Sequence, residues 1–251
     1  MKKRNLAIIA TVIIAVLIVS TYLYAVNSNL IPAQGFGTSK TTLESKPTKA
    51  APTINGIIEN EEYADATKIT ADSINAIVYI KNDNNFAYIA IDASNSSAID
   101  VREEFDLSVL FNTSANQTLL PNTGSDYDII IRMNQDRTIN FTVRHLVYTN
   151  EPLTLIMNGW QVMHEKDFGS SNTGTLSTLE VSWTAGAHRI YEMKIPLQGE
   201  YGINAKPGDT IGITIARVEN IKTKITAHTW PATANTKDPA SWNLLKLAAA
   251  T

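Results

Sequence analysis

The chain has 251 residues, of which 44% are hydrophobic and 18% charged, enough apolar material for one large domain or two small ones. It contains no cysteine, so disulfides are excluded and an exported chain must rely on its core, on hydrogen bonds or on ions. Removing Lys2, Lys3 and Arg4 from the 21 basic residues leaves 18 against 24 acids, a net charge of −6 beyond the N-terminus. Beyond that end the chain has no cluster of Lys and Arg residues that could neutralise phosphates, so we expect no nucleic-acid partner.

An almost unbroken apolar stretch runs from Leu6 to Val26. A helix of about 21 residues at ~1.5 Å each spans about 30 Å, the thickness of the hydrocarbon layer. The basic residues before it place that end in the cytoplasm by the positive-inside rule. Residues 1–26 are therefore predicted to be a transmembrane helix in the cell membrane, with the remaining chain outside the cytoplasm. A signal peptide cleaved after Ala25 is the alternative, and it would make the protein secreted.

Residues 27–51 are rich in Ser, Thr, Gly, Pro and Lys, and their apolar positions follow no period of 2 or 3.6. This composition predicts a flexible tether. Beyond Pro52, short apolar alternations separated by turn residues continue almost to the end of the chain. They predict one domain over residues 52–251, without a long helix.

The clearest strand signals are residues 75–81 and 86–92, which flank the turn-forming segment 82–85. In the second strand Phe86, Tyr88 and Ala90 share one face, and the alternate residues share the other. Further strands are predicted at 105–111, 126–133, 138–148, 160–165, 179–183, 189–195 and 210–218, with one more indicated at 240–247. Many short strands with polar loops predict an all-β fold: an antiparallel β-sandwich, jelly-roll-like, preceded by one N-terminal transmembrane or signal helix. Closure of the sheet into a barrel stays open as an alternative.

Four stretches occur in a characteristic order between residues 52 and 248. They are the opening Pro52–Ile58 with Glu62 and Tyr63, the hairpin 76–92, the segment Tyr191–Leu197 followed by Pro207–Asp209, and the closing Trp230–Pro231, Asp238–Pro239 and Ser241–Trp242. Together they resemble the family 9 carbohydrate-binding modules and their wider clan, which includes DOMON-like sandwiches that bind haem or sugars. The chain departs from that pattern at Asn55 and Asn112, where aspartate is usual, which weakens any calcium site at those positions.

The resemblance implies a module that binds a polysaccharide or a cell-surface glycan. Trp160 and Trp183 flank the polar loop 167–178 and are the predicted sugar-binding rings, because pyranose C–H groups stack on aromatic faces. The alternative for any tryptophan is a place in the core. Trp230 and Trp242, which lie in the closing stretch, are predicted to be structural.

The acids suggest a metal. Asp126 and Asp128 alternate in one predicted strand and so lie about 7 Å apart on one face. Asp106 belongs to a neighbouring strand and Asp92 ends the hairpin. Carboxylates and loop carbonyls suit calcium, the candidate metal, although ordinary solvated acids are the alternative. Paired carboxylates can hydrolyse glycosides, but the chain has no nucleophile–base or metallohydrolase motif, so we expect it not to be an enzyme.

Four Asn-x-Ser/Thr sequons are predicted glycosylation acceptors: Asn95, Asn112, Asn116 and Asn140. Haem is the less favoured cofactor, because methionines such as Met133 and Met193 fill cores as readily as they bind iron. The rival functions are a surface-layer or filament subunit that pairs through sheet edges and, less favoured, a haem-binding electron-transfer domain.

Overall fold

The structure is a computed structural model that describes residues 40–94, 104–113, 126–133, 139–147, 159–167, 173–185, 188–221, 224–236 and 238–249. The described residues form strands and loops, with two single-turn 3-10 helices, η1 (Asp72–Ile74) and η2 (Pro239–Ser241). No helix among them is long and apolar enough to cross a membrane. The predicted helix over residues 1–26 lies outside the described residues.

Eight strands form one sheet, called sheet A. Its order is β1-β15-β13-β6-β7-β8-β9, and β14 pairs with the second half of β13. The bounds are β1 (Thr42–Glu44), β6 (Glu104–Asn112), β7 (Asp126–Met133), β8 (Ile139–Val147), β9 (Gly159–Asp167), β13 (Thr210–Ile221), β14 (Lys224–Trp230) and β15 (Asn243–Lys246). All neighbours are antiparallel except the short pair β1 and β15.

Seven strands form the second sheet, called sheet B. Its order is β10-β11-β12-β5-β4-β2, and β3 also pairs with β4. The bounds are β2 (Lys46–Pro47), β3 (Thr67–Ala71), β4 (Ala76–Asn82), β5 (Phe86–Ser94), β10 (Thr173–Leu176), β11 (Leu179–Ala185) and β12 (His188–Pro196). Here β2 and β4 are parallel and every other pair is antiparallel.

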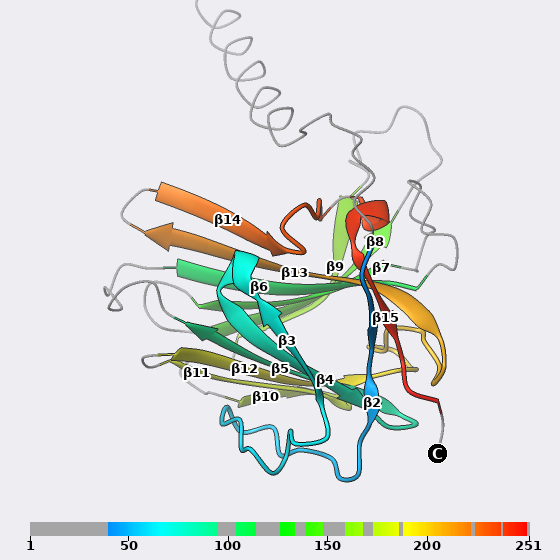
Figure 1. Cartoon of the computed structure of the whole chain (residues 1–251). Coiled ribbons are helices and arrows are strands. Elements are labelled where there is room, and N and C mark those ends of the chain that lie inside the picture. The colour runs from blue at the N-terminus through cyan, green and yellow to red at the C-terminus, as the bar shows by residue number, and fades with distance from the viewer. Residues whose placement is uncertain are drawn as a thin grey trace, which may run out of the picture. The chain divides into compact units, whose positions relative to one another are not determined.

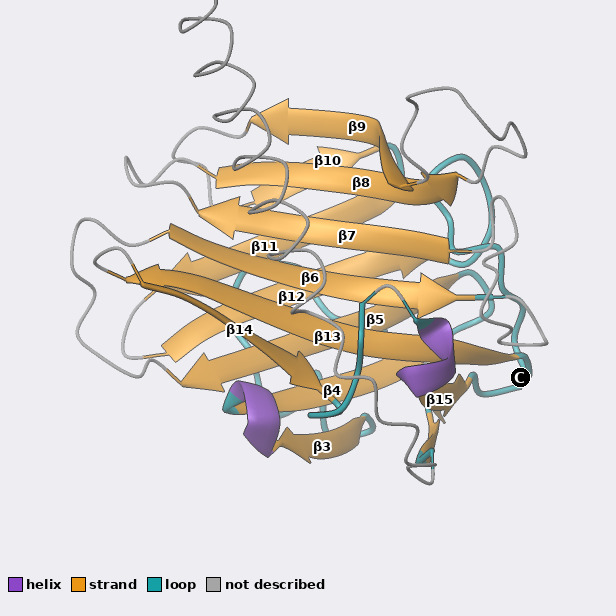
Figure 2. Cartoon of the chain, turned by 90° about the horizontal axis from the view of Figure 1, so that it is seen from above, coloured by secondary structure: helices purple, strands orange, loops and turns teal. Residues whose placement is uncertain are grey.

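The two sheets form two layers, as both views show (Figure 1, Figure 2). Alternation puts the apolar residues of each strand between them: in β5, Ala87, Ile89 and Ile91 belong to the main core cluster, whereas Tyr88 and Ala90 lie on the outer face. The predicted all-β, two-layer sandwich is therefore confirmed, with the correction that two short strand pairs are parallel. Among the described residues the sheets share no strand, so they do not form one closed barrel.

One extended segment joins the two layers. β1 adds to sheet A beside β15, and two residues later β2 adds to sheet B beside β4. The bonds are between main-chain groups: Ser45 N–H donates to Lys246 O at 2.8 Å, and Thr48 N–H donates to Asn82 O at 2.9 Å. The tether predicted over residues 27–51 thus contains two strands at its C-terminal end. Most of its side chains are polar and show no strand period, because main-chain bonds to β15 and β4 hold this segment and, of its described residues, only Leu43 packs against the main core.

The irregular segment between β2 and β3 lies along the outer face of sheet B. Figure 1 shows it in blue and cyan below β12, β5 and β4. Tyr63 and Ala66 pack there against Ala90 in a small cluster apart from the main core. Residues 48–66 are called the covering segment below, because they bury part of a sheet face that would otherwise be exposed.

Candidate functional site

A buried carboxylate fixes the covering segment to sheet B. Glu192, on the outer face of β12, is fully buried. Its Oε2 accepts hydrogen bonds from the N–H groups of Asn55, Gly56 and Ile57 at 3.0, 2.6 and 3.2 Å. Tyr63 Oη donates to Oε1 at 2.9 Å, and Ser182 Oγ donates to Oε2 at 3.2 Å. Two of the stretches that carry the resemblance, Pro52–Ile58 and Tyr191–Leu197, therefore meet at one carboxylate.

Glycine is required where this loop touches the sheet. Gly56 has a φ of +83°, and a Cβ there would fall 2.5 Å from Thr184 Oγ1. Burial raises the pKa of Glu192, while the hydrogen bonds from Gly56 and Tyr63 act in the opposite direction. Burial also raises the pKa of Tyr63, so its hydroxyl stays protonated and donates. This polar centre is structural, since its groups are enclosed and bonded to one another.

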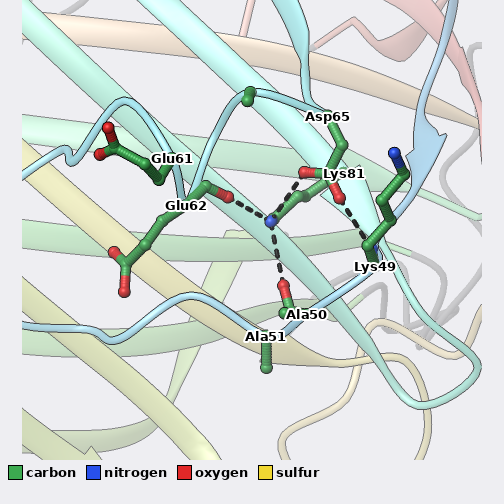
Figure 3. A pocket seen from close by; sticks show the side chains of 8 residues that line it. Lys49, Ala50, Ala51, Glu61, Glu62, Asp65 and Lys81 are labelled. Carbon is green, nitrogen blue, oxygen red and sulfur yellow. Dashed lines mark hydrogen bonds and ion pairs between the residues drawn. The ribbon is translucent and has the colours of Figure 1, made fainter.

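A second buried charge lies beside a cavity of about 520 Å³ (Figure 3). Lys81, on the outer face of β4, has a side chain that is 1% exposed. Its Nζ donates to Ala50 O at 3.1 Å, to Glu62 O, and to Asp65 Oδ1 at 2.9 Å. Since an ammonium has three N–H donors, all of them are used. The lysine side chain is therefore held in place by the covering segment.

A third feature is an open pocket at one end of sheet B, called the rim pocket. Its volume is about 300 Å³, and it is formed by three connections: the β4–β5 turn, the β10–β11 turn and the end of β12. The lining residues are Asn84, Asn85, Phe86, Thr178, Pro196, Leu197 and Gln198. They include three side-chain amides, one hydroxyl and one aromatic ring, and no ionisable group.

The β4–β5 turn is held rigidly by Asp83. Its Oδ1 accepts from the N–H groups of Asn85 and Phe86, both at 2.7 Å, and its Oδ2 accepts from Tyr88 Oη at 2.7 Å. Leu197 N–H donates to Asn85 O at 2.8 Å, which ties the turn to the chain after β12. The rim pocket is thus assembled before any ligand arrives.

The aromatic ring in the rim pocket is also fixed. Phe86 is half-buried, and the Lys194 ammonium lies 4.6 Å from its ring centroid, within cation–π range. Lys194 in turn pairs with Glu180 Oε1 at 2.5 Å, so the charges of these two side chains balance. By contrast, the side chains of Asn84, Asn85 and Thr178 bond to no residue that the structure describes, and their polar groups are available to a ligand.

The tryptophans divide as follows. Trp230 and Trp242 are buried, at 8% and 1% exposure, as predicted for structural rings. Trp183 is half-buried and packs against the main core near the end of β11. The backbone of Trp160 lies at the start of β9, in the other sheet, and its side chain lies outside the described residues. The structure therefore places the two candidate rings on different sheets.

The candidate calcium ligands are also spread over two sheets. Asp92 lies in sheet B, where its Oδ1 is 2.6 Å from His188 Nδ1, whereas Asp128 lies in sheet A and is fully buried. The backbones of Asp106 and Asp126 lie in β6 and β7, but their side chains are outside the described residues. Within the described part of the chain no three His, Asp or Glu side chains form a group that could hold a metal ion. Calcium binding by these acids stays a prediction.

Of the four sequons, only Asn112 has a described side chain. It is fully buried in β6, and glycosylation of the four sequons stays a prediction. The backbone of Asn140 lies in β8, while Asn95 and Asn116 lie outside the described residues.

Comparison with known proteins finds similarity among solved structures alone. No family model matches the chain. No curated protein matches it either. Among solved structures it is similar to a family 9 carbohydrate-binding module from Caldicellulosiruptor kristjanssonii in complex with cellotriose. The identity is 12%, the match covers 84% of this chain and 94% of that one, and the TM-score is 0.48. At this level the likeness assigns no function, which has to be argued from the side chains.

Little in the sequence indicates the rim pocket. From the sequence its asparagines are only residues that favour a turn, and Phe86 is only a strand residue. The available signal was a ring directly after two adjacent asparagines at a hairpin tip, since exposed aromatic and amide groups on loops are typical of binding sites.

Proposed function

We propose that this protein is a non-catalytic carbohydrate-binding module, held outside the cytoplasm by its N-terminal segment. The observation that carries the proposal is the rim pocket, in which side-chain amides and a hydroxyl surround a fixed aromatic ring. Sugar rings offer the matching chemistry: C–H groups that stack on an aromatic face, and hydroxyls that both donate and accept. Amides match those hydroxyls because each has two donors and an acceptor.

The size of the rim pocket favours a small part of a glycan. About 300 Å³ is the lower end of the range for small-molecule sites, roughly 300–1,000 Å³. A pocket of this size at the end of a sheet suits a chain end or a short branch rather than a long polymer lying across the domain.

The pocket also lacks the groups that hydrolysis requires. General acid–base cleavage of a glycoside needs two carboxyl groups on either side of the bond. None of the residues that line the rim pocket carries a carboxyl or an imidazole group, and the nearby carboxylates of Asp83 and Glu180 are engaged by Tyr88 and Lys194. Binding without chemistry is therefore the activity that this site supports.

The test is a binding assay with variants of Phe86. Isothermal titration against a panel of neutral and acidic oligosaccharides, cellotriose among them, identifies a ligand for the wild type. Phe86→Leu keeps an apolar side chain but removes the π face, and it should weaken binding about 2- to 13-fold for a stacking energy of about 0.5–1.5 kcal/mol. Phe86→Tyr keeps the ring and should bind like the wild type.

Variants of the amides complete the test. Asn84→Ala and Asn85→Ala should each weaken binding, since each removes hydrogen bonds worth about 0.5–1.5 kcal/mol. Asn60→Ala is the matched control, because Asn60 is an exposed asparagine in a turn outside the rim pocket. Wild-type affinity in Phe86→Leu, Asn84→Ala and Asn85→Ala together would show that the ligand binds elsewhere.

A further inference from the structure

The Lys81 ammonium occupies a cage of oxygens drawn from three places in the covering segment. Ala50 and Glu62 each contribute a main-chain carbonyl, and Asp65 contributes a carboxylate oxygen (Figure 3). The contacts to Ala50 O and Asp65 Oδ1 are 3.1 and 2.9 Å. Asp65 is itself oriented, because its Oδ2 accepts the N–H of Lys49 at 2.7 Å. Segments that are 15 residues apart in the chain therefore converge on one positive charge.

This donor set is the one that calcium takes from proteins. Hard cations prefer carboxylate and main-chain carbonyl oxygens, often from irregular loops, with water filling the remaining positions. The cavity of about 520 Å³ beside Lys81 gives water access to the same place. The three oxygens can bind any cation of suitable size at the centre of the cage, because each of them acts only as an acceptor.

The lysine fits the position well. Its stem rises from β4 beneath the covering segment, and its Nζ lies 5.4 Å from the centroid of the Tyr63 ring, which adds a cation–π contact. Although burial acts to raise the pKa of Asp65, the Lys49 N–H and the Lys81 ammonium hold it below 3.8, so Asp65 remains a carboxylate partner at neutral pH. The ammonium thus fills the cage, and its positive charge is balanced by the carboxylate of Asp65.

We propose that the Lys81 cage is a calcium-type oxygen site whose permanent occupant is the lysine ammonium, so that the covering segment is held on sheet B without a metal ion. A divalent cation cannot share the cage, because it would lie within contact distance of the ammonium. Removing the lysine side chain leaves the three oxygens around a space that calcium can enter. This role for Lys81 is independent of sugar binding at the rim pocket.

The experiment compares Lys81→Ala with Lys81→Met in the full-length protein, melted in EDTA and in calcium. Both variants should melt roughly 10 °C below the wild type, because each leaves Asp65 and two carbonyls without their cation. Calcium at about 10 mM should restore roughly 5 °C to Lys81→Ala if the vacated site binds at about 0.1–1 mM. In Lys81→Met the side chain still fills the space, so calcium should restore nothing. Any calcium response of the wild type, for example from the acids predicted above as calcium ligands, is the baseline from which the response of each variant is measured.

A double variant identifies the site. In Lys81→Ala/Asp65→Asn the carboxylate is lost, and the calcium response should disappear. If Lys81→Ala is unfolded in EDTA, recovery of its circular dichroism on adding calcium replaces the melting temperature as the readout. The proposal is overturned if calcium does not stabilise Lys81→Ala, if it stabilises Lys81→Met equally, or if the response survives in the double variant.

Discussion

Replacing Glu192 with alanine removes the acceptor that orders the start of the covering segment. The N–H groups of Asn55, Gly56 and Ile57 and the hydroxyl of Tyr63 would lose their shared partner. Gly56 and Tyr63 are buried and water cannot easily replace the carboxylate there. We therefore expect a large loss of stability.

The size of that loss follows from the number of buried donors that are left without an acceptor. A buried donor without an acceptor costs about 1–3 kcal/mol, so Gly56 N–H and Tyr63 Oη alone give roughly 2–6 kcal/mol. For a domain of this size 1 kcal/mol lowers Tm by about 2–4 °C, so the expected fall is about 5–20 °C. Glu192→Gln keeps an acceptor oxygen for the three N–H groups, while Tyr63 can turn its hydroxyl to accept from the new amide. It should lose less than about 2 kcal/mol, since only the charge assistance is removed.

The assay is thermal unfolding followed by circular dichroism for the wild type, Glu192→Ala, Glu192→Gln and Glu59→Ala. Glu59 is an exposed carboxylate on the same segment, so its variant controls for the loss of a surface charge. Because burial raises the folded-state pKa of Glu192 above its ordinary value, the folded state binds a proton that the unfolded state has released only at pH values between the two pKa values. Its contribution to stability is full below pH 4.5 and is lost as pH rises through the folded pKa, and Glu192→Gln should lack that decline. Equal melting of Glu192→Ala and Glu59→Ala would refute the reasoning.

Three further predictions concern the same segment and the anchor. Gly56→Ala should cost at least about 1 kcal/mol in denaturant unfolding, because the residue has a φ of +83° and a Cβ would meet Thr184 Oγ1 at 2.5 Å. Since the pKa of Asp65 lies below 3.8 in the folded state, its stabilisation is full above that pH and is lost in acid, so Asp65→Asn should lose less stability than the wild type between pH 4 and pH 2. External protease should release the domain from intact cells, because residues 1–26 are predicted to remain in the membrane; a mature N-terminus at Val26 in mass spectra would contradict this.

The central strands could be predicted because their buried positions are occupied by apolar residues, which gives the sequence a recognisable pattern. β5 is rich in aromatic and β-branched residues and β12 alternates apolar with polar ones, and the predicted ranges 86–92 and 189–195 lie inside the observed strands. β1 and β2 carry no such signal, since main-chain bonds hold their polar residues at the edges of the sheets. β3, β10 and β14 were missed for a similar reason: each has a neighbour on one side only, and few of its residues need to be apolar.

The rim pocket could not be predicted from the sequence, for a different reason. Its residues belong to three connections, around positions 85, 178 and 197, whose proximity follows only from the order β10-β11-β12-β5-β4 in sheet B. Each connection looks like an ordinary polar turn when taken alone. Strand order arises from long-range pairing, which local composition does not encode.

Lys81 and Glu192 show how an irregular segment can cover a sheet without leaving peptide groups unbonded. A covering loop buries N–H and C=O groups that have no ladder to join. Here Glu192 accepts from three successive N–H groups, and Lys81 donates to two carbonyls of the same segment. Tyr63 touches both charges, with its hydroxyl on Glu192 and its ring near Lys81. Glu192 and Lys81, two buried charges on this face, therefore do for the covering segment what strand pairing does elsewhere in the domain.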